Sequence, residues 1–309
     1  MTRKILIVGG TGLIGGAAAL HLASLGYAVT IAGRTAPRSP TLAVLPFIAG
    51  SYLENELNHG VLEGFDTLVF AACNDIRQLP PGADEFGYFH RANSIGVPAF
   101  FARARDAGIK RAVYVGSYYS ELVSAERIAK SGYLISRQRA DEGVRALARR
   151  DFAVCSLNAP FVIGYIEEVP ALHLQMLVAY LLRCIEPEGP RYVIPGGANF
   201  MSTRSFAEGI AGAIERGESG RAYLMGDESW TFERYFNCYL EALGSPERVQ
   251  VRDAPHPVLP DTSLYAGRGA TLSYEPNADL MARLRYRRHD AERAIFEMVP
   301  YYRSQAFGG

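Results

Sequence analysis

A run of glycines that directly follows an apolar segment constrains this chain more than any other feature of its sequence. Residues 4–8 have the continuous apolar character of a parallel strand buried on both faces, and residues 13–25 follow with a helical pattern. Between them, Gly9 would allow a sharp turn, Gly12 would let backbone N–H groups approach a pyrophosphate, and Gly15 would let the helix pack closely on the sheet. The residues predicted to hold a dinucleotide in this loop are Gly9, Thr11, Gly12, Leu13, Ile14 and Gly15. A tight turn that binds no ligand is the alternative interpretation.

The first half of the chain alternates strand and helix patterns. The predicted strands are residues 4–8, 28–32, 46–49, 67–71, 112–115 and 153–157, and long helices are predicted over 86–107 and 134–149. This alternation predicts an α/β fold with a doubly wound parallel sheet of the Rossmann type. After Asn158, clusters of proline and glycine predict a smaller, irregular C-terminal lobe of short helices and loops. We expect a dinucleotide-binding domain over 1–158 and a mainly substrate-binding lobe over 159–309, from which some segments return to the first domain.

The composition argues against several classes of partner. Lys and Arg total 32, as do Asp and Glu, so nothing attracts the chain to nucleic acid or to an anionic membrane. The apolar stretch 171–182 is shorter than the roughly 20 residues that a membrane-spanning helix needs. The four cysteines are scattered, and neither they nor the six histidines have metal-ligand spacing. Five glycines within residues 9–16 would interrupt the apolar helix of a secretory signal, so we expect a cytoplasmic protein that binds a small molecule and no metal.

The residue after the second strand is expected to select the cofactor. An acidic side chain there would bind the adenosine ribose hydroxyls, but this chain has Gly33 followed by Arg34. The guanidinium of Arg34 suits a 2′-phosphate, which predicts NADP as the cofactor, with NAD as the other possibility. An ordinary solvated arginine is the alternative interpretation of Arg34.

Three later residues are candidates for the chemistry. Ser117 follows a predicted strand, and Tyr133 and Arg137 are four positions apart, hence on one face of the next helix. A free tyrosine has a pKa of about 10, so Tyr133 needs a nearby cation if it is to exchange protons at neutral pH. A serine hydroxyl can hold the substrate oxygen. Because Ser117 and Tyr133 both fall at the carboxyl edge of the predicted sheet, we expect them to act together beside the nicotinamide.

These residues together resemble the extended or atypical branch of the short-chain dehydrogenase/reductase family, the epimerase/dehydratase-like group. The resemblance covers nearly the whole chain, and it assigns Ser117 and Tyr133 as the catalytic pair, with Asn93 as the helix asparagine. It also implies that Ala71 and Ala72 line the adenine pocket. In this family the two long helices commonly form a four-helix bundle between subunits, which implies a homodimer.

The chain departs from the family pattern at the position of the cationic side chain of the motif. The motif Y-x-x-x-K has Arg137 in place of its lysine, and Asn158 replaces the arginine that is common after the sixth strand. In relatives the lysine binds the nicotinamide ribose and lowers the tyrosine pKa. Arginine keeps the positive charge but is bulkier and planar. We expect Tyr133 and Arg137 to contact the cofactor in an adapted but active site.

The sequence predicts the substrate less precisely than it predicts the cofactor. Tyr118, Tyr119, Phe161 and Tyr165 are expected to line its site, and Glu167-Glu168 would repel a diphosphate that faced them. The arginines that offer an anion site instead are Arg191, Arg204 and Arg268. Three hypotheses follow: an NADP-dependent oxidoreductase acting on a small ketone or secondary alcohol, a nucleotide-sugar epimerase or dehydratase that reuses its hydride, and a non-catalytic dinucleotide sensor.

Overall fold

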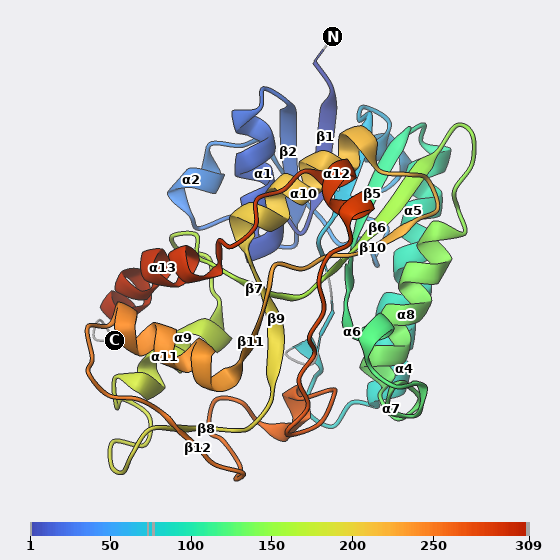
Figure 1. Cartoon of the computed structure of the whole chain (residues 1–309). Helices are drawn as coiled ribbons and strands as arrows, with labels where there is room; N and C mark the ends of the chain where they lie inside the picture. Colours follow the sequence, from blue (N-terminus) through green and yellow to red (C-terminus); the bar gives the residue numbers. More distant parts are fainter. Residues whose placement is uncertain (1, 73, 76–77, 307–309) are drawn as a thin grey trace.

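A seven-stranded parallel sheet forms the centre of the molecule (Figure 1). The computed structural model describes residues 2–72, 74–75 and 78–306. The sheet has the order β10-β6-β5-β4-β1-β2-β3. Its strands are β1 (Lys4–Val8), β2 (Ala28–Gly33), β3 (Phe47–Ala49), β4 (Thr67–Phe70), β5 (Arg111–Ser117), β6 (Ala153–Ala159) and β10 (Ala222–Leu224). The predicted doubly wound α/β fold is therefore confirmed, and the strand order reverses between β1 and β4, where such sheets bind ligands.

The sheet is buried on both faces because successive side chains of each strand enter different cores. In β1, Ile5 and Ile7 pack on one side while Leu6 and Val8 pack on the other. The helices α1 (Leu13–Ser24), α10 (Thr203–Arg216) and α12 (Ala278–Leu284) cover the first side. The other side carries α5 (Gly96–Asp106) and α8 (Gly132–Arg145). Short helices complete this part of the chain: α2 (Pro40–Ala43), α3 (His59–Leu62), α6 (Tyr119–Leu122) and α7 (Ala125–Ala129).

The long helix predicted over 86–107 has a wider turn in its middle. It consists of α4 (Glu85–Phe89), a π-helix (His90–Ile95) and α5. Pro98 has no N–H to donate to the carbonyl of Ser94, which weakens the regular α-helical pattern at this point. Single π turns of this kind occur frequently at functional sites.

The C-terminal half is more regular than the sequence predicted. It contains a three-stranded sheet of β7 (Phe161–Ile163), β9 (Gly197–Ser202) and β11 (Glu228–Thr231), and a pair, β8 (Tyr192–Val193) and β12 (Gln250–Val251). Its helices are α9 (Leu172–Leu181), α11 (Phe232–Ala242) and α13 (Ala291–Ala306). The expectation of short helices and loops alone is thus wrong, because proline and glycine lie mostly between these elements. β10 and α10 return to the first domain.

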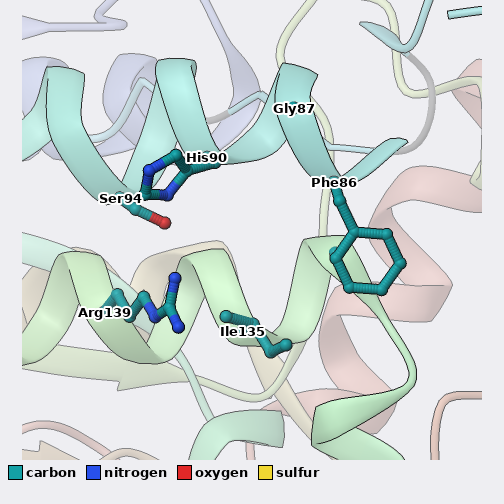
Figure 2. A pocket seen from close by; sticks show the side chains of 7 residues that line it. Phe86, Gly87, His90, Ser94, Ile135 and Arg139 are labelled. Atoms are coloured by element: carbon teal, nitrogen blue, oxygen red, sulfur yellow. The ribbon is translucent and has the colours of Figure 1, made fainter. Parts of the chain in front are cut away.

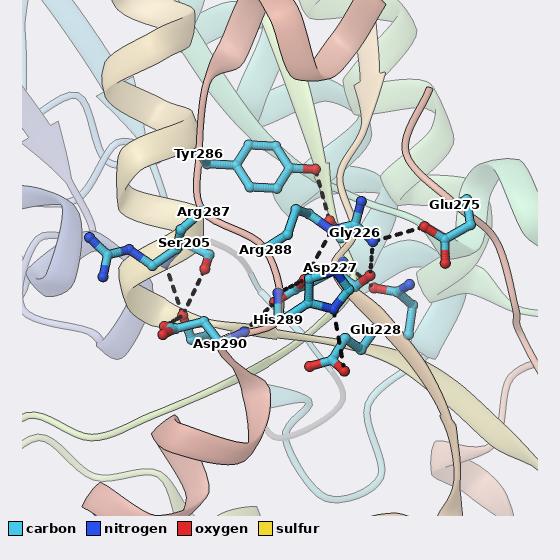
Figure 3. A network of polar contacts seen from close by, with 12 residues as sticks. Ser205, Gly226, Asp227, Glu228, Glu275, Tyr286, Arg287, Arg288, His289 and Asp290 are labelled. Atoms are coloured by element: carbon cyan, nitrogen blue, oxygen red, sulfur yellow. Dashed lines mark hydrogen bonds and ion pairs between the residues drawn. The ribbon is translucent and has the colours of Figure 1, made fainter. Parts of the chain in front are cut away.

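A buried carboxylate ties the end of the chain to this half (Figure 3). Asp227 is fully buried, and it accepts hydrogen bonds from Nε of Arg288 at 3.0 Å and from the backbone N–H groups of His289 and Asp290 at 2.6 and 3.1 Å. These bonds fix the entry to α13. Asp227 and His289 also lie near Glu228 in a group that could ligate a cation, but the three hydrogen bonds on Asp227 indicate a structural role.

No helix in the part of the chain that the structure describes is long and apolar enough to cross a membrane.

Candidate active site

The glycine loop lies at the reversal point of the sheet. Gly9 has a φ of +83°, which favours glycine, and its N–H donates to the carbonyl of Ala32 in β2 at 2.9 Å. A Cβ atom on Gly9 would lie 2.6 Å from the backbone nitrogen of Ala72 and 2.7 Å from the carbonyl carbon of Ala71. The loop after β1 and the end of β4 therefore meet at Gly9, as expected for an adenine pocket beside the phosphate turn.

The other two glycines of the motif, Gly12 and Gly15, are needed for different reasons. A Cβ atom on Gly15 would lie 2.2 Å from the carbonyl oxygen of Gly9, so close packing of α1 on the loop requires glycine there. A Cβ atom on Gly12 would meet only that same oxygen, at 3.4 Å, and Gly12 is exposed. Packing within the protein therefore does not require a glycine at position 12. A ligand that approaches the backbone there does.

The N-terminus of α1 is open to an anion. No side chain caps it, and its first turn carries no acidic residue. The N–H groups and positive dipole end of such a helix attract phosphate. Leu13 and Ile14 of this turn are half-buried and pack toward the cores. The residues present thus fit a dinucleotide pyrophosphate.

Arg34 lies next to the glycine loop. It directly follows β2, is exposed, and has no hydrogen bond or ion pair among the described residues. A Cβ atom at the preceding Gly33 would lie 3.0 Å from Oγ1 of Thr11, so the glycine loop and the end of β2 are in contact. Arg34 therefore remains available for a phosphate close to the loop.

Ser117 is the last residue of β5 and is 7% exposed. Its Oγ accepts a long hydrogen bond, 3.4 Å, from the backbone N–H of Tyr119. Among the described residues no acceptor takes its hydroxyl proton, so that proton is available to a substrate oxygen. Burial raises the pKa values of Tyr118 and Tyr119, which keeps both phenols protonated at neutral pH.

Tyr133 lies in the first turn of α8 and is 9% exposed. Glu85 of α4 accepts a hydrogen bond from the backbone N–H of Tyr133 at 3.2 Å. A Cβ atom on Gly132 would lie 2.9 Å from Cα of Phe86, so α4 and α8 pack closely directly before the tyrosine. The Tyr133 ring meets Phe89 edge-on, with ring centroids 5.5 Å apart. Packing between α4 and α8 thus fixes the position of the phenol.

Arg137 is buried between α8 and the sheet. It is 3% exposed, and its Nη2 donates to the carbonyl oxygen of Val115 in β5 at 2.8 Å. Its guanidinium carbon lies 5.4 Å from the centre of the Tyr114 ring. The arginine that replaces the family lysine therefore links the helix of Tyr133 to the strand of Ser117.

Asn93 is a second buried residue that holds α8 in position. It is fully buried in the π-helix, and its Nδ2 donates to the carbonyl of Asn74 at 2.9 Å and to Oγ of Ser136 at 3.0 Å. Ser136 in turn donates to the carbonyl of Tyr133 at 2.7 Å. These contacts give Asn93 a positioning role between the loop after β4 and the start of α8.

Several tyrosine rings lie near the end of β5 and the start of α8. Tyr118 and Tyr119 have ring centroids 4.4 Å apart, and Tyr119 contacts Tyr265 at 4.9 Å. Tyr265 stacks on Tyr133, with centroids 5.1 Å apart and an interplanar angle of 26°. The structure therefore brings Tyr118, Tyr119 and Tyr133 together as predicted for a substrate site. It adds Tyr265, which no local sequence pattern singled out.

The other two predicted substrate residues have different neighbours. Phe161 packs against Phe200 and Tyr235 in the core of the C-terminal half. Tyr165 stacks on Tyr301 of α13, which Figure 1 shows on the opposite flank of the molecule from α8. The structure does not bring Phe161 or Tyr165 to the tyrosine cluster.

The three arginines considered for an anion are engaged elsewhere. Arg191 is 2% exposed, and its guanidinium donates to backbone carbonyls between positions 180 and 189. Arg268 forms ion pairs with Asp261 and Asp253, and Arg204 lies 3.8 Å from Glu297. Arg191 and Arg268 are therefore not open to a phosphate, and Arg204 is half-exposed beside Glu297.

Comparison with known proteins identifies the family. The model of the NAD dependent epimerase/dehydratase family matches residues 5–226. A Synechocystis sp. protein provisionally named dihydroflavonol 4-reductase is 26% identical over 74% of this chain and 69% of its own length.

Solved structures share the fold at low sequence identity. A UDP-glucose-4-epimerase from Stenotrophomonas maltophila, solved with bound NAD, has a TM-score of 0.78 and 14% identity, covering 99% of this chain and 100% of its own. A dTDP-glucose 4,6-dehydratase from Streptomyces venezuelae has a TM-score of 0.73 and 21% identity, covering 98% of this chain and 97% of its own. Together with the family match, the site geometry leads to one conclusion: the chain belongs to the NAD dependent epimerase/dehydratase family and is an NAD(P)-dependent enzyme of the short-chain dehydrogenase/reductase type.

Proposed function

We propose that this protein is an NADP-dependent oxidoreductase that interconverts a small ketone and a secondary alcohol. The observation that carries the proposal is the ring cluster at Tyr133, whose phenol meets Phe89 edge-on and stacks on Tyr265. A nucleotide sugar brings a diphosphate that needs compensating charge, and the arginines considered for it are paired or used by backbone carbonyls. An uncharged carbonyl compound needs no such partner.

Two side chains take part in the proposed reaction. Tyr133 donates its phenolic proton to the carbonyl oxygen as that oxygen gains negative charge, and the hydroxyl of Ser117 holds the same oxygen by a hydrogen bond. A reduced nicotinamide, when bound, supplies the hydride that the carbonyl carbon accepts. The positive charge of Arg137, held between α8 and β5, favours loss of the proton from Tyr133.

The preference for NADP rests on Arg34. The Arg34 guanidinium, which has no ion pair with any described residue, suits a 2′-phosphate. No acidic residue directly follows β2 to bind the ribose hydroxyls. Solved relatives of this fold contain NAD, so NAD is the competing cofactor.

The likeness to nucleotide-sugar enzymes supports a second candidate, an epimerase or dehydratase that reuses its hydride. Net consumption of cofactor separates the two. We expect the protein to oxidise NADPH in proportion to added ketone, and Tyr133→Phe to slow this about 10²–10⁴-fold with cofactor affinity nearly unchanged. Conversion of a UDP- or dTDP-sugar without net NADPH oxidation would support the second candidate. Tight cofactor binding with no turnover of either class would favour a sensor.

The cofactor assignment has its own paired test. Arg34→Ala should weaken NADPH binding by about 1.5–3 kcal/mol and leave NADH binding unchanged, because one charge-assisted partner of the phosphate is lost. Arg38→Ala is the matched control, since Arg38 is also exposed and lies in the same loop. Equal affinities of the unmodified protein for NADPH and NADH would contradict the assignment.

A further inference from the structure

We propose that Tyr265 is a specificity-determining residue of the active site, and that it selects carbonyl compounds that carry a planar ring next to the carbonyl group. This inference rests on the proposed function, since it names the substrate class of that same site. No sequence motif around Tyr265 predicts a role in substrate selection, because the residue lies in a loop far beyond Tyr133 and Arg137 in the chain.

The position of the ring carries the argument. Tyr265 stacks on Tyr133 with centroids 5.1 Å apart, and it also contacts Tyr119, at 4.9 Å and an interplanar angle of 65°. Tyr119 lies two positions after Ser117. Tyr265 is therefore in direct contact with the ring of the proton donor and with the loop that carries the oxygen-binding serine. A substrate bound at Tyr133 would therefore lie close to this ring.

The ring packs on an apolar core. Tyr265 and Ala266 pack on a small core separate from the main cores of the molecule, made of Phe89, Val123, Ile128, Tyr133 and Leu134. Aromatic pairs gain stability from edge-to-face and offset-stacked contacts beyond the burial of area alone. The partly buried rings of Tyr119 and Tyr265 would offer this kind of contact to a planar ring more than to a saturated one or to a sugar.

The loop that carries Tyr265 is held in place on both sides. Past the tip, the N–H of Gly269 donates to the carbonyl of Pro195 at 3.3 Å, and the N–H of Gly197 donates to the carbonyl of Ala270 at 3.1 Å. Arg268 pairs with Asp261, which opens the same loop. These contacts make the ring a fixed wall of the site, so its effect should appear in substrate selection.

Two probe ketones isolate the aromatic contribution. Acetophenone and cyclohexyl methyl ketone share one carbon skeleton and differ in the planarity of the ring. Their binding to the full chain is measured by calorimetry with NADP⁺ present, which prevents reduction. We expect acetophenone to bind about two- to tenfold more tightly, and Tyr265→Leu to bring the ratio close to unity. Tyr265→Phe keeps the ring and should keep the ratio.

A matched control tests whether removing any stacked tyrosine has this effect. Tyr301 stacks on Tyr165 with the same centroid distance, 5.1 Å, at an interplanar angle of 25°, but on the opposite flank. Tyr301→Leu should leave the ratio unchanged. Thermal unfolding of each variant shows that it is folded.

The outcomes separate this inference from the proposed function. An aromatic preference that Tyr265→Leu abolishes, without turnover of any ketone, would support the role of Tyr265 and contradict the proposed reaction. Ketone reduction with equal binding of the two probes, or a ratio that survives Tyr265→Leu, would overturn the role of Tyr265 and leave the reaction standing.

Discussion

At the scale of single residues, Arg137 is the departure that matters most. A lysine at this position would carry a compact charge, whereas the guanidinium of Arg137 bonds the carbonyl of Val115 and lies over Tyr114. Arg137 therefore does two things: it holds α8 against β5, and it places a positive charge on α8 four residues after Tyr133. The family pattern predicts the charge, but the contact with the strand follows only from the fold.

Substitution of Arg137 separates these tasks. Arg137→Met should lower the free energy of unfolding by about 1–3 kcal/mol, because a buried carbonyl loses a charged donor. It should also raise the apparent pKa of the catalytic step and slow turnover near neutral pH. Arg137→Lys keeps the charge and should retain activity. Urea denaturation and a pH–rate profile measure the two effects, and an Arg137→Met protein with both unchanged would contradict this account.

The sequence predicts the residues of the site unevenly. Ser117, Tyr133 and the glycines belong to local motifs, and the parallel sheet brings their strand ends to one edge, so their meeting was predictable. Tyr265 was not predictable, because its contact with Tyr133 depends on how the C-terminal loop is folded back. Phe161 was assigned to the substrate from its place after β6, yet it packs against Phe200, since an apolar ring in a short strand is more often part of a core.

At the scale of elements, two glycines of the unit formed by β1, its loop and α1 have different functions. Gly15 permits the helix to lie against the loop, whereas Gly12 has room for a side chain within the protein. Gly12→Ala should leave the unfolding free energy within about 1 kcal/mol of the unmodified value and weaken dinucleotide binding. Gly15→Ala should destabilise the fold itself, because its Cβ would lie 2.2 Å from a carbonyl oxygen.

The measurement for this pair is denaturant unfolding without cofactor, followed by cofactor titration of each folded variant. Loss of stability in Gly12→Ala equal to that in Gly15→Ala would show that position 12 is required for packing and not for a ligand.

The elements themselves were predicted where periodicity dominates. β1, β2 and the buried strands of the sheet follow from apolar runs, and α1 from its start after the glycines. The π-helix at His90–Ile95 was not predicted, because a wider turn leaves no clear signal in a short amphipathic pattern. The strands of the C-terminal half were not predicted, because most of them are short and proline and glycine lie between them.

At the scale of the whole molecule, one helical face is left uncovered by the elements that the structure describes. A groove of about 280 Å³ runs between α4 and α8 (Figure 2), and its walls are Phe86, Gly87, His90, Ser94, Gly132, Ile135 and Arg139. Phe86 and the nearby Ile95 are 48% and 55% exposed. We propose that a second copy of the chain covers this face, as the family resemblance implies.

A single charge should disrupt such a dimer. Phe86→Glu is expected to convert the protein to a monomer in light scattering, because the contact would lose an apolar ring and would have to desolvate a carboxylate. Phe296→Glu is the control, since Phe296 is 45% exposed but belongs to α13 on the opposite flank. A monomeric unmodified protein, or a Phe86→Glu variant that still dimerises, would contradict the proposed interface.

The central claim is that the site formed by Ser117, Tyr133 and the glycine loop transfers a hydride from the cofactor to an external carbonyl compound. The most direct measurement follows deuterium from NADPH labelled at nicotinamide carbon 4, using each hydride face in turn and an accepted ketone. The account predicts one deuterium on the carbinol carbon of the alcohol from one labelled face only, with one NADPH oxidised per alcohol formed. An alcohol without deuterium from either face, or a sugar nucleotide altered with no NADPH oxidised, would contradict it.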